Sequence, residues 1–187
     1  TKLGVLENLI HKVDHLIVGG AMANTFLYAT GVTVGSSLYE EDMSKTARNI
    51  IDKARYSNCI IHLPVDAVVA SKLSDGSASN IASIDAIPPE KMILDVGPGT
   101  LDNIEAVLGT CKTLVWNGPL GAFEFRPFDA GTNAVAKSAS KLTEAGKLLT
   151  VAGGGDTMSA LANAGVVDNF SYISSAGGAF LEWLEGK

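Results

Sequence analysis

The segment Gly153-Gly154-Gly155-Asp156-Thr157 brings three glycines, a carboxylate and a hydroxyl together at one point of the chain. An apolar run precedes it and a helical pattern follows it, so the unpaired N–H groups of a helix start should point outward there. That arrangement favours an anion, and the Thr157 hydroxyl can add a contact to a phosphate oxygen. These residues therefore indicate a site for phosphate groups.

Asp156 has two interpretations that the sequence leaves open. As a helix N-cap, its carboxylate would accept the backbone N–H of Met158 or Ser159. As a metal ligand, it would hold Mg²⁺, because an acid beside polyphosphate is repelled unless a divalent cation lies between them. One residue can do both.

A second polar segment runs from Trp116 to Phe125. Asn117 can donate its amide to a phosphate, or it can form an Asx turn before Gly118. The residues from Gly118 to Gly121 would make a flat apolar floor for an adenine ring. Glu124 lies between two phenylalanines, where we expect it to accept hydrogen bonds from ribose hydroxyls, with a structural salt bridge as the alternative.

Glycines follow five of the apolar runs. One such glycine is often only a turn residue, but several on one sheet edge indicate a surface cleared of side chains for a ligand. The five sites are Gly19-Gly20, Gly97-Pro98-Gly99, Asn117-Gly118-Pro119, Gly153-Gly154-Gly155 and Gly177-Gly178.

The elements that position these residues alternate between short apolar runs and amphipathic stretches. This alternation predicts an α/β fold with a doubly wound, mostly parallel sheet and helices on both faces, a Rossmann-like three-layer arrangement over one domain, 1–187. The polar stretch 65–89 departs from the pattern and predicts a strand pair or loop at the sheet edge. We expect strands at 16–18, 59–63, 92–96, 113–116, 148–151 and 171–173, and helices at 3–13, 22–29, 42–56, 100–108, 128–145, 158–164 and 180–184.

The composition restricts the partners. A net charge of −6 disfavours nucleic acid and anionic membranes, although helix starts can still bind a nucleotide's phosphates. Cys59 and Cys111 are interpreted as core residues of a protein in a reducing compartment, and neither a signal peptide nor a membrane span is evident, so we expect a cytoplasmic protein.

A Gly-x-x-x-x-Gly-Lys-Ser/Thr motif and an opening Gly-x-Gly-x-x-Gly motif are both absent, which excludes a P-loop NTPase and disfavours a dehydrogenase.

Six segments, in this order, resemble the phosphoglycerate kinase family, specifically its carboxyl-terminal nucleotide-binding domain in bacterial-type members. They are DHLIVGGAMANTF (14–26), LPVD (63–66), WNGP (116–119), FEF (123–125), GGGDT (153–157) and LEWLEGK (181–187). The resemblance extends over essentially the whole chain. It implies reversible phosphoryl transfer from 1,3-bisphosphoglycerate to ADP with Mg²⁺, giving 3-phosphoglycerate and ATP.

The resemblance also implies individual roles. Lys2 matches a lysine that contacts the moving phosphoryl group, Glu124 matches the acid on the ribose, and Asp156 matches the magnesium ligand. Catalytic contacts fall to Lys2, Gly154 and Gly155. The adenine slot would be lined by Gly19, Gly20, Gly97 and Pro119, and the phosphates would lie against Asn117, Gly153, Gly154, Gly155, Asp156 and Thr157.

The chain departs from the family in ways that change the expectation. The amino-terminal domain, which carries the basic patch for the phosphoglycerate, is not in this sequence. Ala21 and Ala176 stand where the family usually has glycines, and Ala176 raises the question whether that turn keeps its backbone geometry. We therefore expect half of a kinase, monomeric and inactive alone, with a stand-alone adenine-nucleotide module as the alternative.

Overall fold

The computed structural model describes residues 3–186. Among them no helix is both long enough and apolar enough to cross a bilayer. The helices are α1 (Leu3–Leu9), α2 (Gly20–Ala29), α3 (Ser44–Tyr56), α4 (Pro98–Thr110), α5 (Ala130–Glu144), α6 (Gly155–Ala164) and α7 (Gly177–Glu185). The strands are β1 (His15–Ile17), β2 (Ile60–His62), β3 (Asp66–Ala70), β4 (Asn80–Ser83), β5 (Met92–Val96), β6 (Thr113–Asn117), β7 (Leu149–Gly153) and β8 (Tyr172–Ser174).

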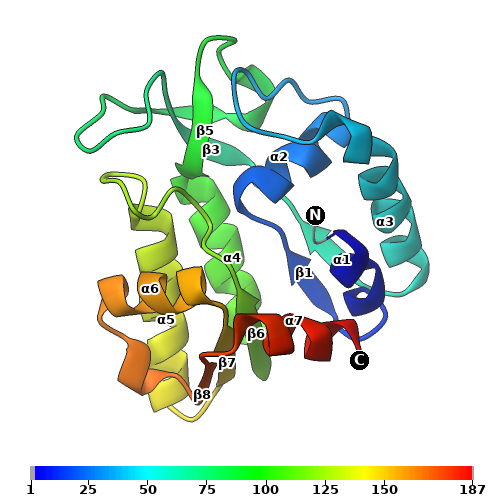
Figure 1. Ribbon diagram of the computed structural model, residues 1–187, viewed down its shortest axis with the longest axis vertical. Coiled ribbons are helices and arrows are strands. Elements are labelled where there is room, and N and C mark those ends of the chain that lie inside the picture. The colour runs from blue at the N-terminus through cyan, green and yellow to red at the C-terminus, as the bar shows by residue number, and fades with distance from the viewer. Residues whose placement is uncertain (1–2, 187) are drawn as a thin grey trace.

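The strands form parallel sheets covered by helices, which confirms the α/β class (Figure 1). Strands β6, β7 and β8 form one parallel sheet, and β1 and β2 form another. Asn117 pairs with Gly153, and Gly153 with Ser174, so the carboxyl ends of β6, β7 and β8 lie in line. This register brings the polar strand ends to one edge.

The pairing differs from a single doubly wound sheet, because the parallel strands form two separate sheets and β5 pairs antiparallel. The stretch 65–89 contains the expected strand pair, β3 and β4, but β3 also pairs antiparallel with β5. Strand β5 therefore belongs to an antiparallel sheet of order β4-β3-β5. Its apolar sequence is equally suitable for either pairing, so periodicity could not distinguish them.

Two hydrophobic cores hold the parallel sheets in place. In α3, Ala47, Ile50 and Ala54 recur at helical spacing and are buried against α1, α2 and the β1-β2 sheet. The second core fills the space between the β6-β7-β8 sheet and helices α4, α5 and α6, with Trp116 and Leu161 among its members. Both cysteines are free, and Cys59 is buried as expected.

Four helices begin earlier than the periodicity predicts. We expected starts at Met22, Thr100, Met158 and Phe180, whereas α2, α6 and α7 start at glycines and α4 starts at Pro98. The first helical residues need no intrahelical N–H bond, so glycine and proline are tolerated there. The glycine turns are thus also the first turns of helices.

Candidate functional site

Four turns at the carboxyl ends of parallel strands meet in the structure. The Gly20 N–H donates to the Leu120 carbonyl at 3.0 Å, which joins the turns after β1 and β6. The Gly118 N–H donates to Thr157 Oγ1 at 2.7 Å, which joins the turns after β6 and β7. A Cβ on Gly177 would lie 3.2 Å from the Gly154 Cα, so the turn after β8 is adjacent as well. We call these turns, residues 18–20, 117–121, 153–157 and 176–178, the glycine edge.

The amino end of α6 is an open part of the glycine edge. The first helical bond runs from the Met158 N–H to the Gly154 carbonyl, which leaves the N–H groups of residues 155–157 without a helical acceptor. A Cβ on Gly155 would meet nothing within 4 Å. Gly154 has φ 98°, and Asn117 Oδ1 lies 2.9 Å from the place of its missing Cβ. Bare peptide N–H groups and the positive helix end thus lie beside Asn117, an arrangement that suits an anion.

Asp156 is the second residue of α6 and not its N-cap. Gly154 occupies the N-cap position, and no side chain caps this helix. The N-cap interpretation is therefore wrong, because Gly155 joins the helix and carries Asp156 past the capping position. Its side chain is exposed. Within residues 3–186 no three His, Cys, Asp or Glu side chains gather to hold a metal, but Mg²⁺ bound with phosphate oxygens and water needs only one or two carboxylates.

Thr157 is buried, and its hydroxyl is used within the fold. Its Oγ1 accepts the Gly118 N–H described above, which fixes the distance between the β6 and β7 turns. A hydroxyl that accepts one bond can also donate its proton, and a contact of Thr157 with a phosphate oxygen stays a prediction.

Glu124 lies on an exposed turn between β6 and α5. The turn is formed by the Phe123 N–H on the Gly121 carbonyl (2.9 Å) and the Phe125 N–H on the Ala122 carbonyl (3.0 Å). Within residues 3–186 the Glu124 carboxylate forms no ion pair, which leaves the salt-bridge alternative without support. The carboxylate is thus free to accept hydrogen bonds from a ligand.

The glycines of these turns are of two kinds. A Cβ on Gly19 would come 2.7 Å from the Leu120 side chain, and one on Gly153 would come 2.2 Å from the Phe180 ring, so both are glycines because neighbours pack against them. In contrast, a Cβ on Gly118, Gly155 or Gly178 would meet nothing within 4 Å. The cleared surface that we predicted is therefore confined to this second group.

Gly97 belongs to the packed kind and lies against Asp66. A Cβ there would lie 2.4 Å from the Asp66 carboxyl carbon. Asp66 accepts the N–H groups of Gly99 and Thr100, each at 2.8 Å, and so caps the start of α4. Asp66 thus has a structural role, and the adenine contact of Gly97 stays a prediction.

The two alanines that replace family glycines fit their positions. Ala176 has φ −91°, which any residue adopts, so its turn does not require glycine. Ala21 is exposed on the first turn of α2. Lys2 lies outside the described residues.

Two further residues carried no prediction. Leu38 is 77% exposed, and its carbonyl accepts the Asn24 side-chain amide at 3.0 Å, which places it beside the middle of α2. Asp95 is only 2% exposed, and burial raises its pKa to about 7. A lone aspartate within the apolar run 92–96 was the available signal for the second.

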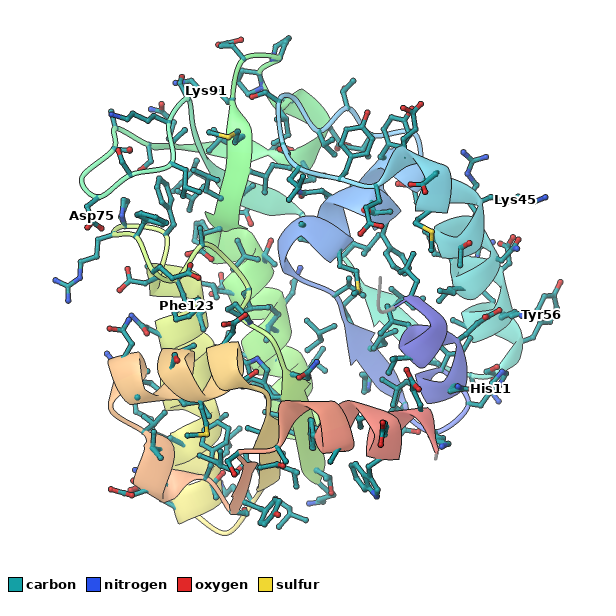
Figure 2. The ribbon with its side chains drawn as sticks, in the orientation of Figure 1. His11, Lys45, Tyr56, Asp75, Lys91 and Phe123 are labelled. Atoms are coloured by element: carbon teal, nitrogen blue, oxygen red, sulfur yellow. The ribbon has the colours of Figure 1, made fainter. Side chains whose placement is uncertain are left out.

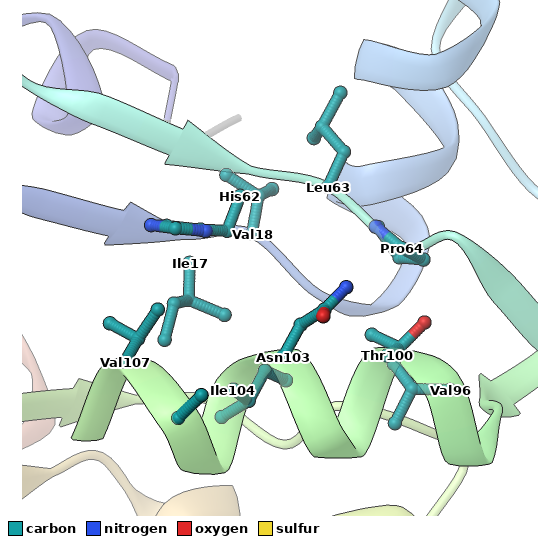
Figure 3. Close-up of a pocket in the computed structure, with 11 residues that line it drawn as sticks. Ile17, Val18, His62, Leu63, Pro64, Val96, Thr100, Asn103, Ile104 and Val107 are labelled. Carbon is teal, nitrogen blue, oxygen red and sulfur yellow. The ribbon is translucent and has the colours of Figure 1, made fainter. Parts of the chain in front are cut away.

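A cavity of about 280 Å³ lies between α4 and strands β1 and β2, and Val18 of the glycine edge is among its lining residues (Figure 3). Its walls are mostly apolar, with His62 and Asn103 among the polar residues. No glycine of the glycine edge lines it. The open turns are therefore the better candidate for a phosphate ligand.

Comparisons with known proteins find relatives that match the whole chain. The family model for phosphoglycerate kinase matches residues 1–187. Phosphoglycerate kinases from Jannaschia sp. and Cereibacter sphaeroides are 58% and 57% identical over the whole chain, which covers 47% of each relative. The chain thus spans about half the length of the curated relatives it matches.

Solved structures show the same fold. Phosphoglycerate kinase from Coxiella burnetii matches 99% of this chain with a TM-score of 0.94 and 44% identity, and the match covers 47% of that protein. The enzyme from Pyrococcus horikoshii matches all of this chain with a TM-score of 0.82 and 26% identity, over 46% of that protein.

Proposed function

The chain belongs to the phosphoglycerate kinase family, and we propose that residues 1–187 form the nucleotide-binding domain of a phosphotransferase. The observation that carries this proposal is the amino end of α6. Its unpaired N–H groups and uncovered Gly155 open onto the glycine edge beside Asn117. Helix starts of this kind bind phosphate without any lysine.

Residues of the glycine edge, together with Gly97 and Glu124, have the following roles in this proposal. The phosphates of ADP or ATP lie against Asn117 and the residues 153–157, including Gly153, Gly154, Gly155 and Thr157. The adenine lies near Gly19, Gly20, Gly97 and Pro119, and Glu124 accepts the ribose hydroxyls. These contacts orient the nucleotide so that its terminal phosphate faces the acceptor.

Asp156 would hold Mg²⁺ together with the phosphate oxygens. The ion supplies neutralisation of the phosphate charge, which phosphoryl transfer requires. The exposed carboxylate of Asp156, without a capping bond, fits this role. Lys2 is assigned to the moving phosphoryl group.

The longer protein would transfer a phosphoryl group reversibly between 1,3-bisphosphoglycerate and ADP in glycolysis. The phosphoglycerate would bind a basic region outside these 187 residues. We also propose that the protein is cytoplasmic and monomeric.

A stand-alone adenine-nucleotide module without catalysis is the second candidate. It is favoured by the net charge of −6 and by the positions of the arginines, since Arg48 and Arg55 lie on α3 and Arg126 lies beside Asp129. None of the three belongs to the glycine edge. Activity measured with the longer protein separates the two candidates.

Isothermal titration calorimetry of the folded chain with MgADP tests the nucleotide site. We expect saturable binding that weakens when Gly155 is replaced by valine, because the side chain would cover the open amino end of α6. The matched control is Gly109→Val, at a glycine of α4 where a Cβ also meets nothing within 4 Å. Absence of heat with millimolar MgADP, on protein shown to be folded by circular dichroism, would refute the site.

A further inference from the structure

Asp95 is a buried carboxyl group that no cation compensates among the described residues. It lies in β5, and its two oxygens accept backbone N–H groups: Oδ2 accepts Gly131 at 2.7 Å and Oδ1 accepts Val96 at 2.8 Å. The nearest titratable group that acts on it is Asp129, another acid, whose own closest cation is Arg126 at 3.9 Å. A charge buried without a counterion is rare unless it has a specific task.

The chain from Gly121 to Gly131, which we call the 121–131 segment, folds tightly around this carboxyl. A Cβ on Gly121 or on Gly131 would come 2.5 Å from Asp95 Oδ1, so only glycine allows this approach at either end. The Ala122 N–H also donates to the Leu94 carbonyl at 2.8 Å. Both ends of the segment are thus fixed to consecutive residues of β5.

The middle of the 121–131 segment carries Glu124. Other contacts hold this loop as well, since the Arg126 N–H donates to Asp75 Oδ1 at 2.9 Å and Phe128 is fully buried. Figure 2 places Phe123 and Asp75 on neighbouring loops at this end of the molecule. Glu124 itself lies exposed and without an ion pair within residues 3–186, so the backbone contacts of the segment, including those at its base, set its position.

We infer that Asp95 is a positioning residue of the nucleotide site, which holds the 121–131 segment so that the Glu124 carboxylate reaches the ribose. This inference rests on the proposed function for its ligand, but not for its geometry. Asp95 touches the segment and not the nucleotide, and its effect on affinity passes through Glu124.

The ionised carboxylate accepts N–H groups more strongly than the protonated form does. Burial is the largest cause that raises the pKa of Asp95 to about 7, the bonds from Gly131 and Val96 lower it, and Asp129 raises it further. Because burial outweighs these bonds, ionisation of Asp95 disfavours the closed segment, which should therefore be held less firmly at pH 8 than at pH 6. Asp95→Asn cannot titrate, and its amide presents donors where the backbone also donates.

Hydrogen exchange measures the geometry without any ligand. In Asp95→Asn we expect the amides of residues 121–131 to exchange at least tenfold faster than in the parent chain, while α3 is unchanged. Ile50→Val, a small change at a fully buried site in α3, is the control for general destabilisation. Equal protection of the segment in Asp95→Asn and the parent chain would overturn the inference even if MgADP binds.

A double-mutant cycle with MgADP measures the consequence. Asp95→Asn should weaken binding about tenfold, and adding Glu124→Gln should cost little more, because both changes remove the same ribose contact. The ratio of parent to Asp95→Asn affinity should fall from pH 6 to pH 8, a comparison in which the titration of the nucleotide cancels. Additive effects in the cycle, or a ratio independent of pH, would mean that Asp95 is only structural.

If Asp95→Asn does not fold, Gly131→Ala reaches the same carboxyl from the opposite side. The new methyl group would displace Oδ1, and we expect the same faster exchange and the same lack of additivity with Glu124→Gln. Unchanged exchange in Gly131→Ala would overturn the inference. Failure of the parent chain to bind MgADP, with the exchange effect present, would refute the proposed function and leave the positioning geometry intact.

Discussion

At the scale of single residues, two exposed carboxylates, one on the glycine edge and one just after it, have different proposed roles. Glu124 lies on the turn after β6, and Asp156 lies on the first turn of α6. Neither has an ion pair within residues 3–186, so each is available to a ligand. Substitution should distinguish a carboxylate that contacts the nucleotide from one that acts through a metal.

Glu124→Gln should weaken nucleotide binding without changing the chemical step. A ribose contact is equal in the ground state and the transition state, so in the longer enzyme KM for ADP should rise about tenfold while kcat stays within about twofold. Steady-state kinetics at varied MgADP make this measurement. A large fall in kcat at constant KM would contradict the ribose role.

Asp156→Ala should act only when the metal is present. We expect the affinity for MgADP to fall about tenfold, because a magnesium ligand is lost, and the affinity for ADP in EDTA to stay the same or to increase as a negative charge is removed. In the longer enzyme, turnover should fall more than metal-free affinity. Calorimetry with and without Mg²⁺ measures the two affinities. An equal loss of nucleotide affinity in both conditions would exclude the metal role.

The sequence predicted the segments that carry the polar groups better than it predicted the position of each residue in its helix or turn. The segment 153–157 could be predicted as a helix start because it separates an apolar run from a helical pattern. The position of Asp156 could not, since it depends on whether Gly155 takes helical dihedrals, which glycine neither favours nor forbids. Gly97 gave no sign of Asp66, which lies 31 residues away in the sequence and approaches only through the β3-β5 pairing.

At the scale of elements, α4 depends on a cap supplied by another strand. Asp66 in β3 accepts the N–H groups of Gly99 and Thr100 and also the Thr100 hydroxyl, at 2.7 to 2.8 Å. Helix α4 has no capping side chain of its own. The antiparallel excursion therefore contributes to the helix that precedes β6.

Asp66→Ala should lower the free energy of unfolding by about 1–3 kcal/mol, because it removes the cap and leaves buried donors unpaired. Urea denaturation followed by circular dichroism measures the change. Asp85→Ala, at an exposed aspartate in the connection before β5, is the matched control and should change stability by less than about 0.5 kcal/mol. Equal midpoints for the two variants would show that the cap contributes nothing.

Strand β5 should also make stability depend on pH. The folded pKa of Asp95, about 7, lies above its ordinary value of 3.8, so the folded state binds a proton that the unfolded state has released. The contribution of Asp95 is therefore fully present below about pH 4 and is lost as the pH rises through about 7. Relative to Asp95→Asn, the parent chain should lose stability between pH 5 and pH 8 in urea melts, whereas a constant difference would contradict the raised pKa.

At the scale of the whole molecule, the two parallel sheets share no strand pairing and are connected through helices and turns. Strands β1 and β6 do not pair, yet the Gly20 N–H reaches the Leu120 carbonyl between their ends. The alternation of strands and helices predicted the fold class correctly, but hydrophobic periodicity carries no information on which strands become neighbours. The glycine edge is therefore a property of the assembled fold.

The last prediction is that this chain alone has no measurable kinase activity. Phosphoryl transfer requires both substrates in line and compensation of the charge on the moving group. We propose one phosphate site at the glycine edge, and a net charge of −6 repels a second, strongly anionic substrate. Arg48 and Arg55 lie on α3, while Arg126 lies beside Asp129, so the arginines provide no acceptor site at the glycine edge.

A coupled assay of the purified 187-residue chain tests this, with and without the separately added remainder of a related phosphoglycerate kinase. We expect no turnover by the chain alone and some recovery on mixing, since closure of two domains also excludes the water that competes as phosphoryl acceptor. MgADP calorimetry on the same preparation is the control that the nucleotide site is formed. Turnover by the chain alone at about 1–100 s⁻¹, the usual range for kinases, would place an acceptor site within these residues and would require one of the scattered basic groups to approach the amino end of α6.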